Sequence, residues 1–178
     1  MGFHSFLQKN RIPLESVMAK SWNKKIFKQI DQQVNKASKD LAEERGACLD
    51  AAEYGYQERF SNKTAIAPTA SISIICGGAS PGVEPVAANS YTHKTLSGSF
   101  NVRNRYLEEI LESHGKNDDE TWSTITTNQG SVSHLDFLTD LEKDVFKTAF
   151  ELNQQWIIEL SGDRTPYISQ AQSVNLFL

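Results

Sequence analysis

The stretch from residue 65 to residue 79 constrains the fold of this 178-residue chain more than any other. It is rich in small, apolar and hydroxyl-bearing residues, and it contains the run Ala67-Pro68-Thr69-Ala70-Ser71-Ile72-Ser73, followed by Gly77-Gly78. Proline presets the backbone for a turn, and small residues let a backbone approach a ligand closely. The composition predicts a buried strand, or a loop that leads into a buried element.

The same stretch is a candidate anion site. Backbone N–H groups that converge at a turn or at the start of a helix usually bind phosphate, and neighbouring hydroxyl groups add donors. No Walker or Rossmann motif accompanies it. On spacing alone, a buried Thr/Ser-rich strand without a ligand is therefore favoured over a phosphate loop.

The clearest helical pattern lies between Pro13 and Gly46. Pro13 is a suitable first helical residue, and Gly46 is a natural stop. Apolar residues step by three and four along one face, opposite a lysine-rich face; they are Ile26, Ile30, Val34, Ala37 and Leu41. Residues 47–64 read as a loop with a short amphipathic piece around Tyr54, Tyr56 and Phe60.

Shorter elements are expected in the second half. Residues 89–103, with Leu96 among their apolar positions, read as an extended hairpin, and short helices are expected at 106–111 and around 122–125. Thr139 and Glu142 form a capping-box pattern at the start of one long helix that Gly162 ends and Pro166 prevents from continuing. Its apolar stripe comprises Leu141, Val145, Phe146, Ala149, Leu152, Trp156, Ile157 and Leu160.

Composition excludes several classes of protein. The formal net charge is -4 with no basic block, which gives no case for nucleic-acid binding. No apolar run approaches the roughly 20 residues that span a bilayer, and the first residues do not form a signal peptide. Two separated cysteines, Cys48 and Cys76, predict reduced thiols in a cytoplasmic protein, and the four histidines lack zinc-site spacing.

Four motifs occur together in one order along the chain. They are Met1-Gly2-Phe3-His4-Ser5-Phe6-Leu7, Glu44-Arg45-Gly46-Ala47-Cys48, Pro68-Thr69-Ala70-Ser71-Ile72-Ser73 and Ala79-Ser80-Pro81-Gly82-Val83-Glu84-Pro85. In this order they resemble the large (alpha) subunit of class I ribonucleotide reductases, in the C-terminal part of its catalytic barrel. The resemblance implies an α/β fold in which residues 1–178 are a single, helix-rich and incomplete fragment of a ten-stranded α/β barrel domain.

The resemblance also implies a binding site. Pro68, Thr69, Ala70, Ser71 and Ile72 would hold the diphosphate of a ribonucleoside diphosphate, with Thr69 and Ser71 as hydroxyl donors. Some relatives carry Glu where this chain has Ala70, which removes one polar contact and leaves the backbone cradle.

The family's catalytic Asn-x-Cys-x-Glu stretch and its redox cysteines do not occur in this sequence. No catalytic residue and no metal ligand is therefore assigned. Apolar neighbours would make the Cys76 thiol inert, and Glu84 is expected to fix a turn. No cofactor would bind directly, because the radical would come from a separate small subunit.

Three interpretations stay open. The chain is a fragment of the reductase, which would need the missing N-terminal part of the large subunit as a partner; an internal-looking start and the apolar end from Val174 to Leu178 favour this. Alternatively, it is a non-catalytic phosphate-binding or assembly module derived from that family. The third possibility is an unrelated α/β protein with a hydroxyl-rich strand.

Overall fold

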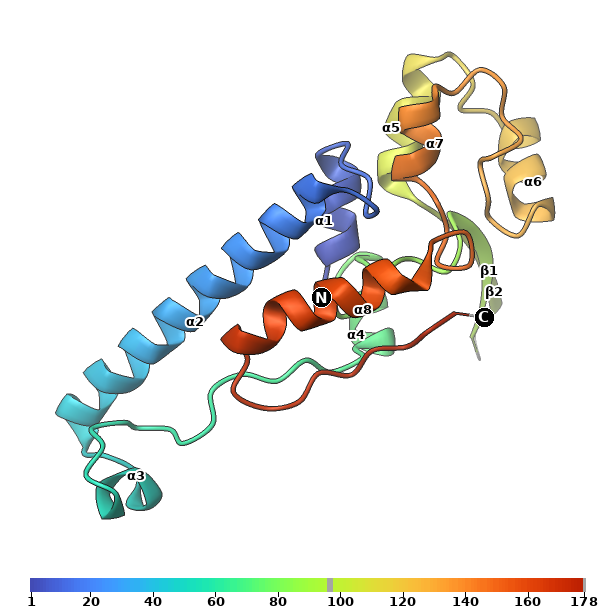
Figure 1. Cartoon of the computed structure of the whole chain (residues 1–178). Coiled ribbons are helices and arrows are strands. Elements are labelled where there is room, and N and C mark those ends of the chain that lie inside the picture. Colours follow the sequence, from blue (N-terminus) through green and yellow to red (C-terminus); the bar gives the residue numbers. More distant parts are fainter. Residues whose placement is uncertain (96–97, 178) are drawn as a thin grey trace. The chain divides into compact units, whose positions relative to one another are not determined.

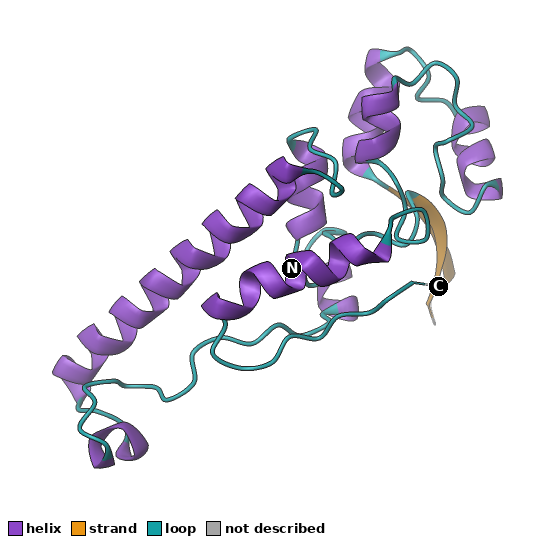
Figure 2. Cartoon of the chain, in the orientation of Figure 1, coloured by secondary structure: helices purple, strands orange, loops and turns teal. Residues whose placement is uncertain are grey.

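The computed structural model describes residues 1–95 and 98–177. Leu96, expected in the hairpin, and Leu178, expected at the apolar end, lie outside the described residues. Helices dominate the described part (Figures 1 and 2). The helices and strands are α1 (Phe3–Lys9), α2 (Val17–Arg45), α3 (Leu49–Glu53), α4 (Ala70–Ile75), β1 (Ser90–Thr95), β2 (Gly98–Arg103), α5 (Arg105–Ser113), α6 (Asp119–Thr127), α7 (Asp140–Val145), α8 (Gln154–Arg164) and the 3-10 turn η1 (Thr165–Tyr167).

The chain divides into two compact units. The first unit comprises Met1–Ala19, Pro68–Ile157 and Val174–Leu178, and the second comprises Lys20–Ala67 and Ile158–Ser173. The assignment of residues 1–178 to a single barrel fragment stays a prediction.

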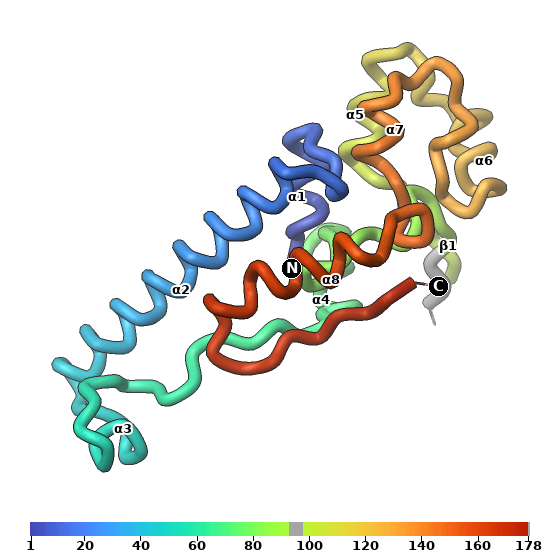
Figure 3. The backbone as a smooth tube through the Cα atoms, in the orientation of Figure 1, coloured from blue at the N-terminus to red at the C-terminus, as the bar shows by residue number. Residues whose placement is uncertain are grey.

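The main core of the first unit is formed by residues of α5, α6 and α7 and of the segment that joins α6 to α7. These three helices lie near one another in the backbone trace (Figure 3). Its buried residues are Leu107, Ile110, Leu111, Trp122, Ile125, Val132, Leu135, Leu138, Val145 and Phe146. The two short helices expected at 106–111 and 122–125 are thus confirmed. Both begin at side-chain caps, since Asn104 accepts from the N–H of Tyr106 and Asp118 from that of Thr121.

The hairpin expected at residues 89–103 is also confirmed. β1 and β2 pair antiparallel, with Ser90 opposite Arg103 and Thr95 opposite Gly98. Asn104 follows directly, and its backbone N–H donates to Asn89 O at 2.8 Å. The hairpin therefore brings the residues at its two ends together.

The single long helix expected from Thr139 onward is wrong, although its capping box is present. The helix breaks between α7 and α8 because backbone N–H groups there have partners outside a helical ladder. Ala149 N donates to Val86 O at 2.8 Å, and Asn153 N donates to a carboxylate oxygen of Glu15 at 2.7 Å.

The expected end of that helix also differs. Gly162 lies inside α8, which continues to Arg164. The chain then forms the 3-10 turn that contains Pro166. Because a proline without an N–H is tolerated in the first turn of a helix, the helix tightens at this point rather than ending at the glycine.

Helix α2 begins at Val17, so the expected start at Pro13 is wrong. Ser16 is the cap, since its hydroxyl accepts from Ala19 N at 3.1 Å and donates to Pro13 O. The stop at Gly46 is confirmed, with φ at +80° directly after the last helical residue.

The expected apolar stripe of α2 is only partly covered in the second unit. Ile30 is 41% exposed, whereas Asn23 and Ser38 are fully buried. Asn23 donates to Leu160 O at 2.8 Å and accepts from Arg164 Nε at 3.1 Å. The amphipathic piece expected in residues 47–64 is wrong as well, because Tyr54, Tyr56 and Phe60 are all at least half exposed. None of the described helices is long and apolar enough to cross a membrane.

Candidate phosphate loop and adjoining pocket

The segment Pro68–Ile72 forms the start of a helix rather than a strand. Thr69 takes the left-handed conformation, with φ at +55°, and its carbonyl accepts from Ser73 N at 2.9 Å to begin α4. The N–H groups of Ala70, Ser71 and Ile72 belong to the first turn, where a helix offers no acceptor. The described residues give these three N–H groups no acceptor either.

The expectation that residues 65–79 are buried is wrong for most of the stretch. Ile72 is 51% and Ile75 84% exposed, and Cys76 is exposed too. Ser73 alone is fully buried among the residues of α4, and its hydroxyl donates to Ala70 O at 2.7 Å. The apolar surroundings expected for Cys76 are therefore absent from the described part of the chain.

Two contacts hold the segment that follows the loop. Gly82 N donates to Thr69 Oγ1 at 2.7 Å, and this bond links the motif at residues 79–85 to the motif at residues 68–73. Glu84 is 5% exposed, and its carboxylate accepts from the backbone N–H and the side-chain amide of Asn175, both at 2.9 Å. Glu84 lies in a turn, as expected, since its N–H donates to Pro81 O, and its side chain also anchors the last segment of the unit.

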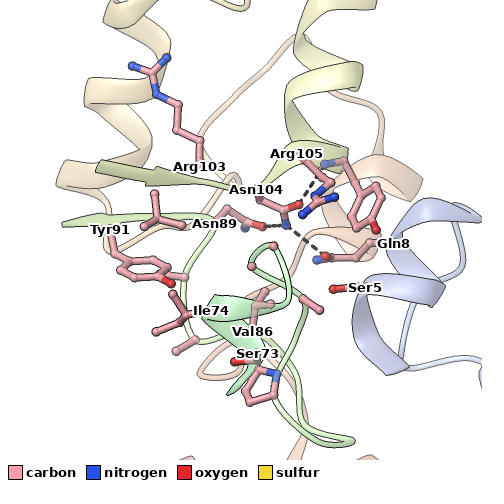
Figure 4. Close-up of a pocket in the computed structure, with 18 of the residues that line it drawn as sticks. Ser5, Gln8, Ser73, Ile74, Val86, Asn89, Tyr91, Arg103, Asn104 and Arg105 are labelled. Atoms are coloured by element: carbon pink, nitrogen blue, oxygen red, sulfur yellow. Dashed lines mark hydrogen bonds between the residues drawn. The ribbon is translucent and has the colours of Figure 1, made fainter. Parts of the chain in front are cut away.

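A pocket of about 640 Å³ lies beside α4 within the first unit (Figure 4). Residues of α1, of α4 and its following turn, and of both ends of the hairpin line it. Three of these carry a chain of amide hydrogen bonds: Asn104 Nδ2 donates to Asn89 Oδ1 at 2.8 Å and to Gln8 Oε1 at 3.0 Å. Of the expected site residues, Ala70 alone lines this pocket; Pro68, Thr69, Ser71 and Ile72 do not.

The charges at the pocket are positive, because Arg103 and Arg105 line it and none of the lining residues is acidic. Arg103 is engaged elsewhere: it pairs with Asp119 at 2.8 Å, and its guanidinium lies 5.1 Å from the centre of the Trp122 ring. Arg105 has no ion-pair partner among the described residues. Its guanidinium lies against Gly77, where a Cβ atom would come within 2.9 Å of Nη2.

A buried histidine supports the wall of the pocket. His4 is 1% exposed, and its Nδ1 accepts from the N–H of Val86, which lines the pocket, at 3.0 Å. Burial lowers the pKa of His4 from 6.5 to about 4, so the ring is neutral at pH 7. Among the described side chains, no cluster of His, Cys, Asp or Glu could hold a metal ion.

Comparison with known proteins identifies the family. The model of the ribonucleotide reductase barrel domain matches residues 1–58 and 49–178. The chain belongs to the ribonucleotide reductase barrel-domain family. It is 47% identical to the ribonucleoside-diphosphate reductase large subunit of Invertebrate iridescent virus 6 and 44% identical to that of Invertebrate iridescent virus 3, covering 100% and 99% of this chain.

A solved reductase structure has the same fold. The class Id ribonucleotide reductase alpha subunit of Actinobacillus ureae aligns over the whole chain with a TM-score of 0.91 and 39% identity. The chain spans 19% and 28% of the two viral relatives and 32% of the solved alpha subunit. The resemblance drawn from the four motifs is thus confirmed, as is a helix-rich part of the reductase α/β barrel.

Proposed function

We propose that residues 68–72 of this reductase barrel segment hold the diphosphate of a ribonucleoside diphosphate in the assembled large subunit. The observation that carries the proposal is the set of three N–H groups, of Ala70, Ser71 and Ile72, that have no acceptor in the described part of the chain. They lie together at the start of α4, in the motif that resembles the family's phosphate loop. Convergent backbone donors of this kind suit a phosphate group.

The chain's part in the reaction is substrate binding, not radical chemistry. Its sequence contains no Asn-x-Cys-x-Glu stretch, and its thiols Cys48 and Cys76 match neither the radical cysteine nor the redox pair of the family. The remainder of the large subunit would supply those groups, and a separate small subunit would supply the radical. Relatives three to five times as long as this chain support the first of these partners.

The isolated chain should reduce no ribonucleotide with any reductant. Deoxyribonucleotide formation should be restored when three components are added. They are a polypeptide with the preceding part of a reductase large subunit, a segment with the family's C-terminal redox cysteines, and the small subunit. The measurement is the yield of deoxyribonucleotide from a radiolabelled ribonucleoside diphosphate. Turnover by the purified chain alone would overturn the division of roles.

Ser71→Ala should weaken nucleoside diphosphate binding by the reassembled protein about fivefold, the equivalent of one hydrogen bond of about 1 kcal/mol. The Ser71 side chain is exposed and has no partner in the described residues, so the melting temperature should not change. Thr69→Asp should weaken binding more, because it places a negative charge beside the incoming phosphate. Thr69→Ala is a less selective probe, since it also removes the bond from Gly82.

Ser99→Ala, at an exposed position of β2, is the matched control and should change neither property. Calorimetric titration and thermal unfolding, run on the same samples, separate the two roles. If Ser71→Ala lowers the melting temperature and leaves diphosphate affinity unchanged, the loop merely packs, and the assignment of residues 68–72 is wrong.

A further inference from the structure

The chain of amide hydrogen bonds beside the pocket, here called the amide chain, has one possible donor-to-acceptor order. Asn89 sets this order. This residue is 1% exposed and donates from Nδ2 to two backbone carbonyls, Gly130 O at 2.9 Å and Phe146 O at 2.7 Å. Carbonyls accept and cannot donate, so the side chain of Asn89 cannot be turned around. Its Oδ1 therefore faces Asn104, which must present Nδ2 to it.

The direction passes from Asn104 to Gln8. Asn104 Oδ1 accepts from Tyr106 N at 3.1 Å as the cap of α5, which fixes the same orientation a second time. Asn104 Nδ2 therefore also donates to Gln8, and Gln8 must accept through Oε1. Gln8 Nε2 is left as the free end of the chain.

Gln8 lines the pocket, and its Nε2 has no acceptor in the described structure. The residue is 2% exposed, and this nitrogen is buried with no hydrogen-bond partner in the described structure. A buried donor left unpaired destabilises the structure, so an acceptor that pairs with it would bind favourably. Figure 4 shows Gln8, Asn104 and Arg105 grouped at one end of the pocket.

The guanidinium of Arg105 adds charge to the same end. It has no carboxylate partner in the described residues, and the glycine beside it leaves its Nη2 uncovered by a side chain. Guanidinium and amide N–H groups donate and do not accept, so this end of the pocket favours a ligand that is an acceptor and negatively charged. The opposite walls are apolar and include Ile74, Pro81 and Val86.

We propose that this pocket is a second binding site, for a small organic oxyanion, independent of the diphosphate loop. The oxyanion contacts Gln8 Nε2 and the Arg105 guanidinium, and the apolar part of the ligand lies against the walls formed by α4 and the segment around Val86. Thr69, Ser71 and Ile72 do not line the pocket, so the site does not depend on the proposed function.

Phenyl phosphate is the probe, because it joins a dianion to a small apolar ring. Titrated calorimetrically into the 178-residue chain at pH 7.5, it should bind more tightly than inorganic phosphate. Its ring packs against the apolar walls, whereas inorganic phosphate has no apolar part. Gln8→Glu should weaken phenyl phosphate binding at least tenfold, because it replaces the unpaired donor with an oxygen and still accepts from Asn104. Arg105→Gln should weaken it to a similar extent.

Two controls make the result specific. Arg45→Gln removes the same charge from the end of α2, which does not line the pocket, and should leave phenyl phosphate affinity unchanged. Ser71→Ala reports any binding of the same anion by the diphosphate loop. Arg105 is exposed, so its variant tests the site even where Gln8→Glu fails to fold. Absence of phenyl phosphate binding, or binding that Arg105→Gln leaves unchanged, overturns the proposal. Binding reduced by Ser71→Ala but not by Arg105→Gln assigns the anion to the loop and overturns it as well.

Discussion

Gly130→Ala is expected to destabilise the chain by at least about 3 kcal/mol, a large part of the roughly 5–15 kcal/mol that keeps a domain of ordinary stability folded. Gly130 follows α6 with φ at +81°, and its N–H donates to Ile125 O at 2.8 Å. A Cβ atom there would lie 2.7 Å from Ala88 Cα and 2.8 Å from Asn89 N. These are backbone atoms, so the clash is relieved only if the two chain segments separate.

The clash would also break the amide chain at Asn89, which donates to Gly130 O. Gly130 O accepts from both the backbone N–H of Asn89, at 3.2 Å, and its Nδ2, at 2.9 Å. Separation of the segments would leave these buried groups unpaired, which adds to the cost of the clash. The melting temperature and the midpoint of urea unfolding measure the combined effect.

Gly115→Ala is the matched control. Gly115 also follows a helix with a positive φ, at +65°, but a Cβ atom there meets nothing within 4 Å. Its substitution should cost only the backbone strain, about 1–2 kcal/mol. If the two variants lose equal stability, close packing at Gly130 is not what holds the segments of the first unit together.

Sequence patterns predicted the elements whose determinants lie within one or two turns. The capping box of Thr139 and Glu142 and the stop at Gly46 depend on neighbours a few residues away, and both are present. The break between α7 and α8 depends instead on Val86 and Glu15, which are distant in sequence. A local pattern does not reveal such distant partners. Apolar residues keep helical spacing on both sides of the break, and the pattern therefore predicts one continuous helix.

The candidate site divides in the same way. The loop at Pro68–Ile72 is contiguous, so its residues could be named from one motif. Its expected burial is wrong, and the strand, one of the two conformations left open, is not formed. The amide chain joins Gln8 to Asn104 across 96 positions. Single amide residues at such a separation give no signal in one sequence, and only the fold brings them together.

The chain should lose stability steeply as the pH falls from about 6.5 to about 4, and His4 should cause much of that loss. Its ring is buried in α1, and its pKa falls from 6.5 to about 4 because burial disfavours the charged form. The unfolded chain keeps the ordinary value. Between the two values the unfolded chain binds a proton that the folded chain does not, so the contribution of His4 is complete above about pH 6.5 and is lost as the pH approaches 4.

The expected loss is about 3 kcal/mol over this window, at up to about 1.4 kcal/mol per pH unit. Carboxyl groups with lowered pKa values, such as Asp118, also contribute as the pH falls, so the wild-type curve alone does not isolate His4. His4→Asn supplies the comparison, because an asparagine oxygen can accept from Val86 N but takes up no proton in this range. Urea unfolding at half-unit steps from pH 7.5 to pH 4 should give curves that diverge below pH 6.5, with the variant losing less stability. Parallel curves would mean that burial does not hold the ring neutral and that His4 adds nothing to the pH dependence of stability in this window.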